Sequence, residues 1–214
     1  KEKDGSLIKR YNNKAKLNNL NPEADLPLVL KSGGNKLIWD MRYPGYKEFE
    51  GMVFYSSPNK GPKAIPGEYL ISLNYNGEVI EQSLKIDKDP RLENTDKDYR
   101  DQFDFLINVR NQVTRANSAI IKIREVQKDL NYLKQKSGLT EEINNLINQF
   151  EIKLSHIENN IHMTKNQSRQ DPLNYGIRIN NRIAFLLADS QRGDYPPTNQ
   201  AKAFFKEITT ELDS

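Results

Sequence analysis

The stretch "DKDPRLENT", residues 87–95, separates two kinds of hydrophobic pattern. Before it, apolar residues recur at every second position, which is typical of half-buried β-strands. After it, they recur at alternating steps of three and four, which is typical of a coiled-coil helix. Thr95 can cap that helix, because Asp98 follows three residues later and its charge suits the positive end of the helix dipole. We therefore predict two domains, residues 1–90 and residues 91–214.

The pattern in the first domain predicts a series of short strands. In "EYLISLNYNGEVIEQSLKI", residues 68–86, two alternating runs flank Asn76-Gly77, which predicts a β-hairpin because both turn residues must accept a positive φ. Four further runs resemble strands and are separated by Gly and Pro turns: Leu7–Tyr11, Leu26–Leu30, Lys36–Arg42 and Met52–Ser56. Six short strands in about 90 residues predict a small β-sandwich.

The second domain begins with a long helical seam: Leu106, Val109, Val113, Ala116, Ile120, Ile123, Gln127 and Leu130. The pattern ends near Lys136, where Ser137-Gly138 offers a left-handed stop and Thr140 a new cap. The same spacing then returns from Ile143 to Ile161. We predict an antiparallel helical hairpin over residues 95–165. Gln127 within the seam would set the register of this pairing. The seam could instead bind a partner helix.

The first helix, at about 40 residues or roughly 60 Å, is longer than the second, at about 25 residues. Its unpaired beginning carries Tyr99, Phe103 and Leu106, which need other cover. Two C-terminal helices, over residues 171–190 and 198–213, can supply it. The predicted fold class is therefore multidomain α+β: an N-terminal β-sandwich followed by an all-α bundle with a protruding hairpin.

Composition excludes several classes of function. Lys and Arg number 32 against 29 Asp and Glu, and the two signs are interspersed, so we expect no nucleic-acid partner. The chain has no Cys, which rules out disulfides, thiolate metal sites and a Cys nucleophile. No apolar run approaches the roughly 20 residues of a membrane span. The chain starts within charged sequence, so we expect a segment of a longer protein.

We predict no catalytic, metal or cofactor site. His156 and His162 are six residues apart on one helix, about 240° around its axis, so they cannot share a metal and should lie at a surface or edge. Nucleophile-elbow and phosphate-loop motifs are missing. Glu48 and Glu50 could form a carboxylate pair for glycoside hydrolysis, but an exposed acidic loop is the commoner meaning of such a stretch.

Aromatic residues gather after "NKLIWDMRYPG", residues 35–45. Strand alternation sends Leu37, Trp39 and Met41 to one face, so Trp39 should be a core anchor, and Asp40 and Arg42 should form a pair on the other face. The candidate binding residues are the rings from the end of this stretch onward: Tyr43, Tyr46, Phe49, Phe54 and Tyr55. They could contact a protein partner, stack on a sugar or simply cap the sandwich core.

Three strings, "KDGSLIKRY", "GGNKLIWDMR" and "AIPGEYLISLNYNGE", resemble the Ig-like module of the flagellar hook-capping protein and of many secreted bacterial proteins. The string "DPLNYGIRINNRIAFLLADSQRGDYPPTNQAKAFF" is similar to the C-terminal region of bacterial sortilin-like proteins with neuraminidase-type repeats, often labelled glycosyl hydrolases. The resemblance implies an Ig-like fold for residues 1–90. It also implies a preceding β-propeller of the same protein as partner, and a secreted, periplasmic or cell-surface location in bacteria.

The propeller's S-x-D-x-G-x-x-W boxes do not occur in this chain, so the resemblance transfers no catalytic residue. A glycosyl hydrolase label would rest on fold analogy alone. We therefore expect a non-catalytic accessory region that braces the propeller or mediates a protein interaction. The alternative is a carbohydrate-binding module that uses the same aromatic residues.

Overall fold

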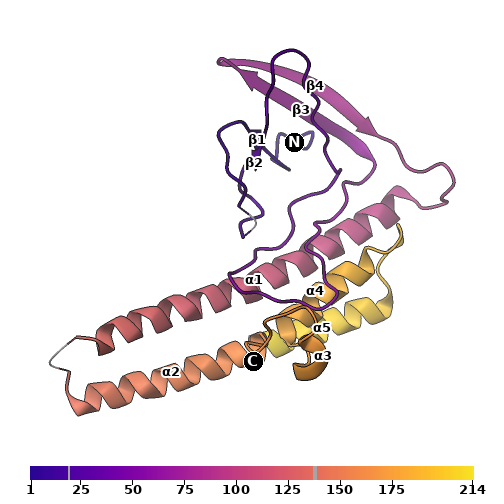
Figure 1. The fold of residues 1–214 in the computed structure, drawn as a ribbon. Helices are drawn as coiled ribbons and strands as arrows, with labels where there is room; N and C mark the ends of the chain where they lie inside the picture. The colour runs from indigo at the N-terminus through magenta and orange to yellow at the C-terminus, as the bar shows by residue number, and fades with distance from the viewer. Residues whose placement is uncertain (19, 137–138) are drawn as a thin grey trace.

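The computed structural model describes residues 1–18, 20–136 and 139–214. Within these residues the chain forms two two-stranded sheets and five helices. Figure 1 shows the strands and their loops standing on one side of the long helix α1, with α2, α4 and α5 along its length. The molecule thus has an N-terminal region of mostly irregular chain and a helical region.

The predicted hairpin is confirmed. Strands β3, Gly67–Tyr75, and β4, Glu78–Ile86, pair antiparallel with Tyr75 opposite Glu78. Asn76 and Gly77 form the turn with φ of 51° and 87°, the left-handed pair of values that a type I′ turn requires. Local sequence therefore determines the position and register of this element.

The Ig-like β-sandwich predicted for residues 1–90 is wrong. Besides the hairpin, this region contains β1, Tyr11–Asn12, and β2, Leu26–Pro27, which form a two-residue parallel ladder. The predicted strands Lys36–Arg42 and Met52–Ser56 form no regular pairing apart from a single bridge between Arg42 and Lys63. The sheets needed for two packed layers are therefore not built.

Two features explain why these runs do not pair. Met41 adopts a φ of 53°, which turns the chain and ends the alternation of faces. Further on, backbone groups bond to helix side chains instead of a neighbouring strand: Lys47 N donates to Thr114 Oγ1 at 3.2 Å and Tyr55 N donates to Asn181 Oδ1 at 2.7 Å. The helical region thus provides hydrogen bonds that a sheet would otherwise provide.

Trp39 is half-buried, not a core anchor. Its Nε1 donates to Arg42 O at 3.1 Å, and its ring meets Tyr69 edge-on with centroids 5.9 Å apart. Leu37 and Met41, predicted to share its face, are both about half exposed because no strand forms there. The predicted Asp40–Arg42 contact forms only through the backbone, where Arg42 N donates to Asp40 Oδ1 at 3.2 Å; the Arg42 guanidinium donates to Gly61 O and Gln191 Oε1, and the Asp40 carboxylate pairs with Lys9.

The predicted helical hairpin and its caps are confirmed. Helix α1, Asp96–Lys134, begins at a capping box in which Thr95 and Asp98 each bond the other's backbone N–H. Helix α2, Glu141–Ile161, begins at Thr140, whose hydroxyl accepts from Ile143 N. The two helices run antiparallel (Figure 1). The predicted stop at Ser137-Gly138 lies outside the described residues.

Three shorter helices complete the helical region. They are α3, Pro172–Tyr175, α4, Ile179–Ser190, and α5, Asn199–Asp213. The single helix predicted over 171–190 is broken, because Gly176 takes a φ of 75° after the short α3 and the chain restarts at Ile179. The predicted start of the last helix near Thr198 is confirmed, and the Thr198 hydroxyl caps α5 by accepting from Ala201 N.

The main core lies between α1, α4 and α5, and it includes one residue of the N-terminal region, Tyr46. As predicted, C-terminal helices cover the unpaired beginning of α1, where Leu106 joins this core. Phe103 is covered differently, by Tyr43 of the N-terminal region, with ring centroids 4.7 Å apart. The two regions therefore share buried side chains.

Candidate functional site

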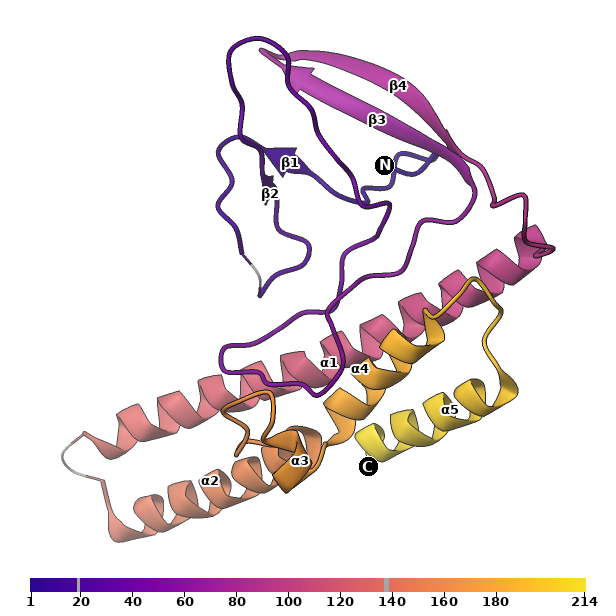
Figure 2. The same ribbon diagram turned by 45° about the vertical axis from the view of Figure 1, so that its right-hand side comes forward.

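The segment Tyr43–Ser57, which we call the aromatic loop, carries all five predicted binding residues. Figures 1 and 2 show the chain leaving the N-terminal region here, crossing α1 and lying against α4. Its backbone bonds to Thr114 of α1 and Asn181 of α4 hold it in place. The loop is thus the main attachment between the two regions.

Its rings point mostly inward. Tyr46 is 1% exposed and its hydroxyl donates to Ser57 O at 2.8 Å. Phe49 is 5% exposed and lies between the Arg124 guanidinium, 4.8 Å from its centroid, and the His162 ring, 4.9 Å away. Phe54 is half-buried beside Tyr46, with centroids 5.9 Å apart. The structure therefore brings Tyr46, Phe49 and Phe54 together as packing against the helices.

The other two rings lie at the margins of the loop. The hydroxyl of Tyr43 donates to Glu2 Oε1 at 2.9 Å, and burial together with Glu2 raises the pKa of this phenol. Tyr55 is 40% exposed, and both its backbone groups bond to the Asn181 amide. Sugar stacking needs an open ring face, so among the five rings Tyr55 presents the most accessible one.

A buried polar cluster lies beneath the loop. Asn180 of α4 is fully buried and its Nδ2 contacts Asn117 Oδ1 at 3.1 Å and His162 Nδ1 at 3.3 Å. Asn117 in turn donates to Lys47 O at 2.7 Å. Asn181 bonds both backbone groups of Tyr55 and the Ser57 hydroxyl. The cluster links α1, α4 and the end of α2 to the loop.

His162 was predicted to lie at a surface or edge, which is wrong, because it is only 2% exposed. Its pKa is lowered to about 4, first by burial and then by the positive charge of Arg124, while the hydrogen bond with Asn180 acts in the opposite direction. The imidazole is therefore neutral at pH 7. His156 is exposed, as predicted.

Sequence reasoning missed the Asn residues of this cluster. Asn117 is fully buried within the first seam, between Val113 and Ile120, and a polar residue at such a position is itself a signal of a buried hydrogen bond. Asn180 and Asn181 carried no comparable signal. They occupy the first turn of α4, and only the docking of the aromatic loop gives them partners.

The two acidic candidates have separate hydrogen-bond partners. Glu48 is half-buried and its Oε1 accepts from Asn59 Nδ2 at 2.9 Å. Glu50 is exposed, and its backbone oxygen accepts from Arg124. Among the described residues no group of three or more His, Asp or Glu could hold a metal ion.

A cleft of about 350 Å³ separates the N-terminal region from the beginning of α1. Arg42 and Lys63 line one wall, and Gln102, Gln191 and Asp194 line the other. Lys63 pairs with Asp194 at 3.0 Å, and Gln102 donates to the backbone oxygens of Ser190 and Gly193. The Lys63–Asp194 pair therefore joins the two walls, and the bonds of Gln102 hold the helical wall together.

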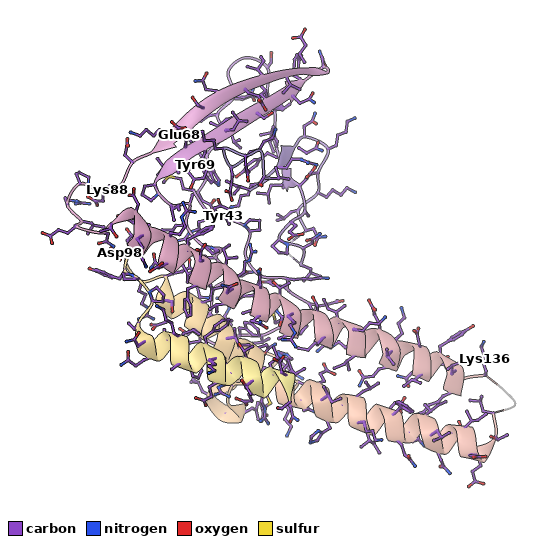
Figure 3. All side chains as sticks on the ribbon, turned by 180° about the vertical axis from the view of Figure 1, so that it is seen from behind. Tyr43, Glu68, Tyr69, Lys88, Asp98 and Lys136 are labelled. Carbon is purple, nitrogen blue, oxygen red and sulfur yellow. The ribbon has the colours of Figure 1, made fainter. Side chains whose placement is uncertain are left out.

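Figure 3 shows Tyr43 and Tyr69 on the same side of α1, between the helix and the β3–β4 hairpin, with Lys88 where the chain passes from β4 toward α1. Burial and the nearby Glu2 carboxylate raise the pKa of Tyr69. These phenols are thus kept protonated, and they serve as hydrogen-bond donors at the base of the hairpin.

No family model, no curated protein and no solved structure matches this chain. The described residues also include no helix that is long and apolar enough to cross a membrane. The site must therefore be judged from its own geometry.

A group of exposed apolar residues of the N-terminal region lies on the β3–β4 hairpin. Leu73 pairs with Ile80, and alternation places Ile71 and Tyr75 on the same face. We call these four residues the hairpin patch, and each is more than half exposed. Trp39 and Tyr69 cover the base of this face and leave its outer part open.

A neighbouring loop adds to this apolar surface. In Figures 1 and 2 the chain after β2 rises beside the tip of the hairpin. That segment contains Val29, Leu37 and Ile38, which are 90%, 53% and 73% exposed. Monomeric proteins rarely expose contiguous apolar surface above a few hundred Å². The hairpin and this loop therefore form the best candidate interaction surface of the N-terminal region.

Proposed function

We propose that this chain is a non-catalytic accessory module that binds a protein partner through the hairpin patch. The proposed partner is a β-propeller domain preceding it in the same protein, as the resemblance of its motifs to sortilin-like proteins suggests. The same resemblance suggests a secreted, periplasmic or cell-surface location. The observation that carries the proposal is the exposed apolar face of the β3–β4 hairpin, bordered by a strand edge that already accepts an extended chain.

The edge in question is the outer side of β3. Lys1 Nα donates to Leu70 O at 2.9 Å and Leu70 N donates to Lys1 O at 3.0 Å. Backbone groups of an antiparallel strand alternate in direction, so Ser72 and Asn74 continue this edge toward the turn. Within the described residues no strand pairs with the edge beyond Leu70. An extended segment, such as the chain that would lead from the proposed propeller into Lys1, can therefore add here in the same register.

Strand addition combines two kinds of contact. Main-chain hydrogen bonds supply affinity, and alternate side chains that meet the apolar face supply specificity. Ile71, Leu73 and Tyr75 lie beside this edge and can receive apolar side chains of a β-rich partner. The aromatic loop supports the same function, because it fixes the N-terminal region to α1 and α4 and so holds the hairpin patch in one orientation.

The test is a titration of the proposed propeller domain into this chain, followed by calorimetry. The double variant Leu73→Asp, Ile80→Asp is expected to weaken binding at least tenfold. The control is Val79→Asp, Ser83→Asp, which places the same charges on the opposite face of the hairpin and on β4, away from the proposed docking edge. It should bind like the original chain.

Two outcomes would overturn the proposal: no binding of the propeller, or equal binding by the Leu73, Ile80 variant. A glycan array with the same chain addresses the alternative. Sugar binding that is lost on Tyr55→Ala but kept in the Leu73, Ile80 variant would favour a carbohydrate-binding module.

A further inference from the structure

Helix α2 carries an apolar stripe that α1, its neighbour in the helical hairpin, does not cover. Its inner side faces α1, where Ser155 accepts from Gln127 at 3.1 Å and Glu158 accepts from Arg124 at 2.8 Å. The uncovered stripe contains Ile143, Leu146, Phe150 and Ile157, which are 43%, 50%, 58% and 47% exposed. Leu154, half-buried, continues it. These residues extend over about 21 Å of helix.

Helix α1 adds apolar residues to the same side. Phe150 and Ile157 each precede a residue that contacts α1, namely Glu151 and Glu158. On α1, Val126 and Leu133 likewise precede Gln127 and Lys134, which contact α2.

Each of these apolar residues thus stands one position before a residue that contacts the other helix. Because α1 and α2 run in opposite directions, this shared offset places the apolar residues of both helices on the same side of the pair. The helical hairpin of α1 and α2 therefore presents one apolar face built from both helices. Leu133 is 40% exposed and Val126 is half-buried on this face.

Part of this flank is already covered by a helix. Arg115 lies five turns before Leu133 and so on the same flank of α1. It forms an ion pair with Asp213 of α5. Nearby, Leu212 packs against the cluster that contains Ala116 and Ile120. The open face is thus the continuation of a surface that packs against a helix within the same chain, which makes a helix its natural occupant.

The spacing of the apolar residues along α2 indicates which helix can bind this face. Ile143 and Ile157 lie seven residues before and after Phe150, and Leu146 and Leu154 lie four before and after it. The stripe is therefore symmetric about Phe150. In an antiparallel pairing around a two-fold axis, residues equidistant from the axis face each other. Such a pairing sets Ile opposite Ile, Leu opposite Leu and Phe opposite Phe.

We propose that two copies of this chain associate through this face, with α2 antiparallel to α2 of the second copy and Phe150 on the two-fold axis. The result is a four-helix bundle of two hairpins, a common arrangement for such faces. The exposed parts of these side chains on both copies amount to on the order of 1,000 Å², which is the lower limit for a specific interface.

The dimensions of the chain permit this pairing. The beginning of α2, Glu141, is nine residues or about 14 Å from Phe150. The contact between Arg124 and Glu158 is about 12 Å from Phe150 in the other direction, and Arg115 is nine residues or about 14 Å beyond that contact. The second copy's hairpin therefore ends before it reaches α5.

The test is sedimentation equilibrium of the full 214-residue chain. The original chain is expected to form a dimer at micromolar concentration, and Phe150→Glu should raise the dissociation constant at least a hundredfold. The matched control is Ile152→Glu, on the opposite side of α2 and 71% exposed, which should leave the dimer unchanged. Far-UV circular dichroism checks that each variant keeps its helices.

A second pair of variants tests the register. Ile143→Glu and Ile157→Lys should each weaken the dimer, whereas the double variant should restore it, because each new Glu would face a new Lys of the second copy. Within one chain these positions are about 21 Å apart and cannot compensate each other. A monomeric original chain, a dimer that tolerates Phe150→Glu or a double variant without recovery would each overturn the proposal.

Discussion

The N-terminal region and the helical region both have regular hydrophobic patterns, but only the helical region has the regular structure that its pattern predicts. In a helix each hydrogen bond joins residues four apart, so a local pattern is sufficient to form it. A strand needs a partner from elsewhere in the chain. The hairpin at Asn76-Gly77 forms because its partner is only two residues away.

The comparison shows that the N-terminal region relies on the helices for its packing. Phe49 and Tyr46 are buried among residues of α1, α2 and α4, and Asn117 and Asn181 bond the loop's backbone. The β3–β4 hairpin, in contrast, extends away from the helices (Figure 1) and leaves most of its side chains exposed. Substitutions in these two parts should therefore have different effects.

The largest effect is expected for Phe49→Ala. Removing a ring that is 5% exposed should lower the free energy of unfolding by about 3–5 kcal/mol. Urea denaturation can be followed by fluorescence of Trp39, the chain's single Trp, and by far-UV circular dichroism of the helices. Both signals should shift together, because the ring packs against both regions.

Phe185→Ala is the matched control, since this ring on α4 is 39% exposed and its removal should cost about 1 kcal/mol or less. If Phe49→Ala shifts the Trp39 signal and leaves the helical signal unchanged, the two regions unfold independently and the shared core is not important for stability.

A smaller effect is expected from pH. The folded pKa of His162, about 4, lies below its ordinary value of 6.5, so the unfolded chain binds a proton that the folded chain excludes. The stabilising effect is complete above pH 6.5 and is lost as pH falls toward 4. The loss is about 3 kcal/mol, measured as the change in free energy of unfolding across this range.

Acidic residues also titrate near the lower end of this window, so the measurement is a comparison of variants. His162→Gln should lose this part of the pH dependence, while His156→Gln, on the exposed side of the same helix, should keep it. An identical pH profile for His162→Gln and the original chain would contradict the buried, neutral state of His162.

The smallest effect is expected for Gly77→Ala. Gly77 has a φ of 87° in the hairpin turn, and Ala in this conformation costs about 1 kcal/mol. Hydrogen exchange should become faster in β3 and β4, while the helices should unfold at the same urea concentration. Gly34→Ala is the control, because its φ is ordinary and its surroundings are open. Faster exchange in α1 would indicate that the hairpin supports the helical region.

Several features of the fold could be read from particular residues. Thr95 and Thr140 were recognised as helix caps, because a capping hydroxyl acts within three residues. Gly176 was overlooked as a break in the helix predicted over 171–190, although a Gly at the end of a turn is a known stop signal. The prediction of a β-sandwich was wrong because alternation predicts that a segment is extended but does not identify the strand with which that segment pairs.

The candidate site depended more strongly on the tertiary structure. The sequence alone identified the five rings of the aromatic loop as a cluster, but it could not show that Tyr46 and Phe49 are buried against helices more than 50 residues away. Nor could it show that Ile71, Leu73, Tyr75 and Ile80 would be left exposed.

The sequence by itself determined the β3–β4 turn, the helix caps and the antiparallel hairpin, because each depends on residues close together in the chain. Only the tertiary structure decided where the aromatic loop packs, why His162 is neutral and which apolar faces remain open. The physical reason is that burial is a property of the assembled chain: a Phe or His has the same local pattern whether a distant helix covers it or not.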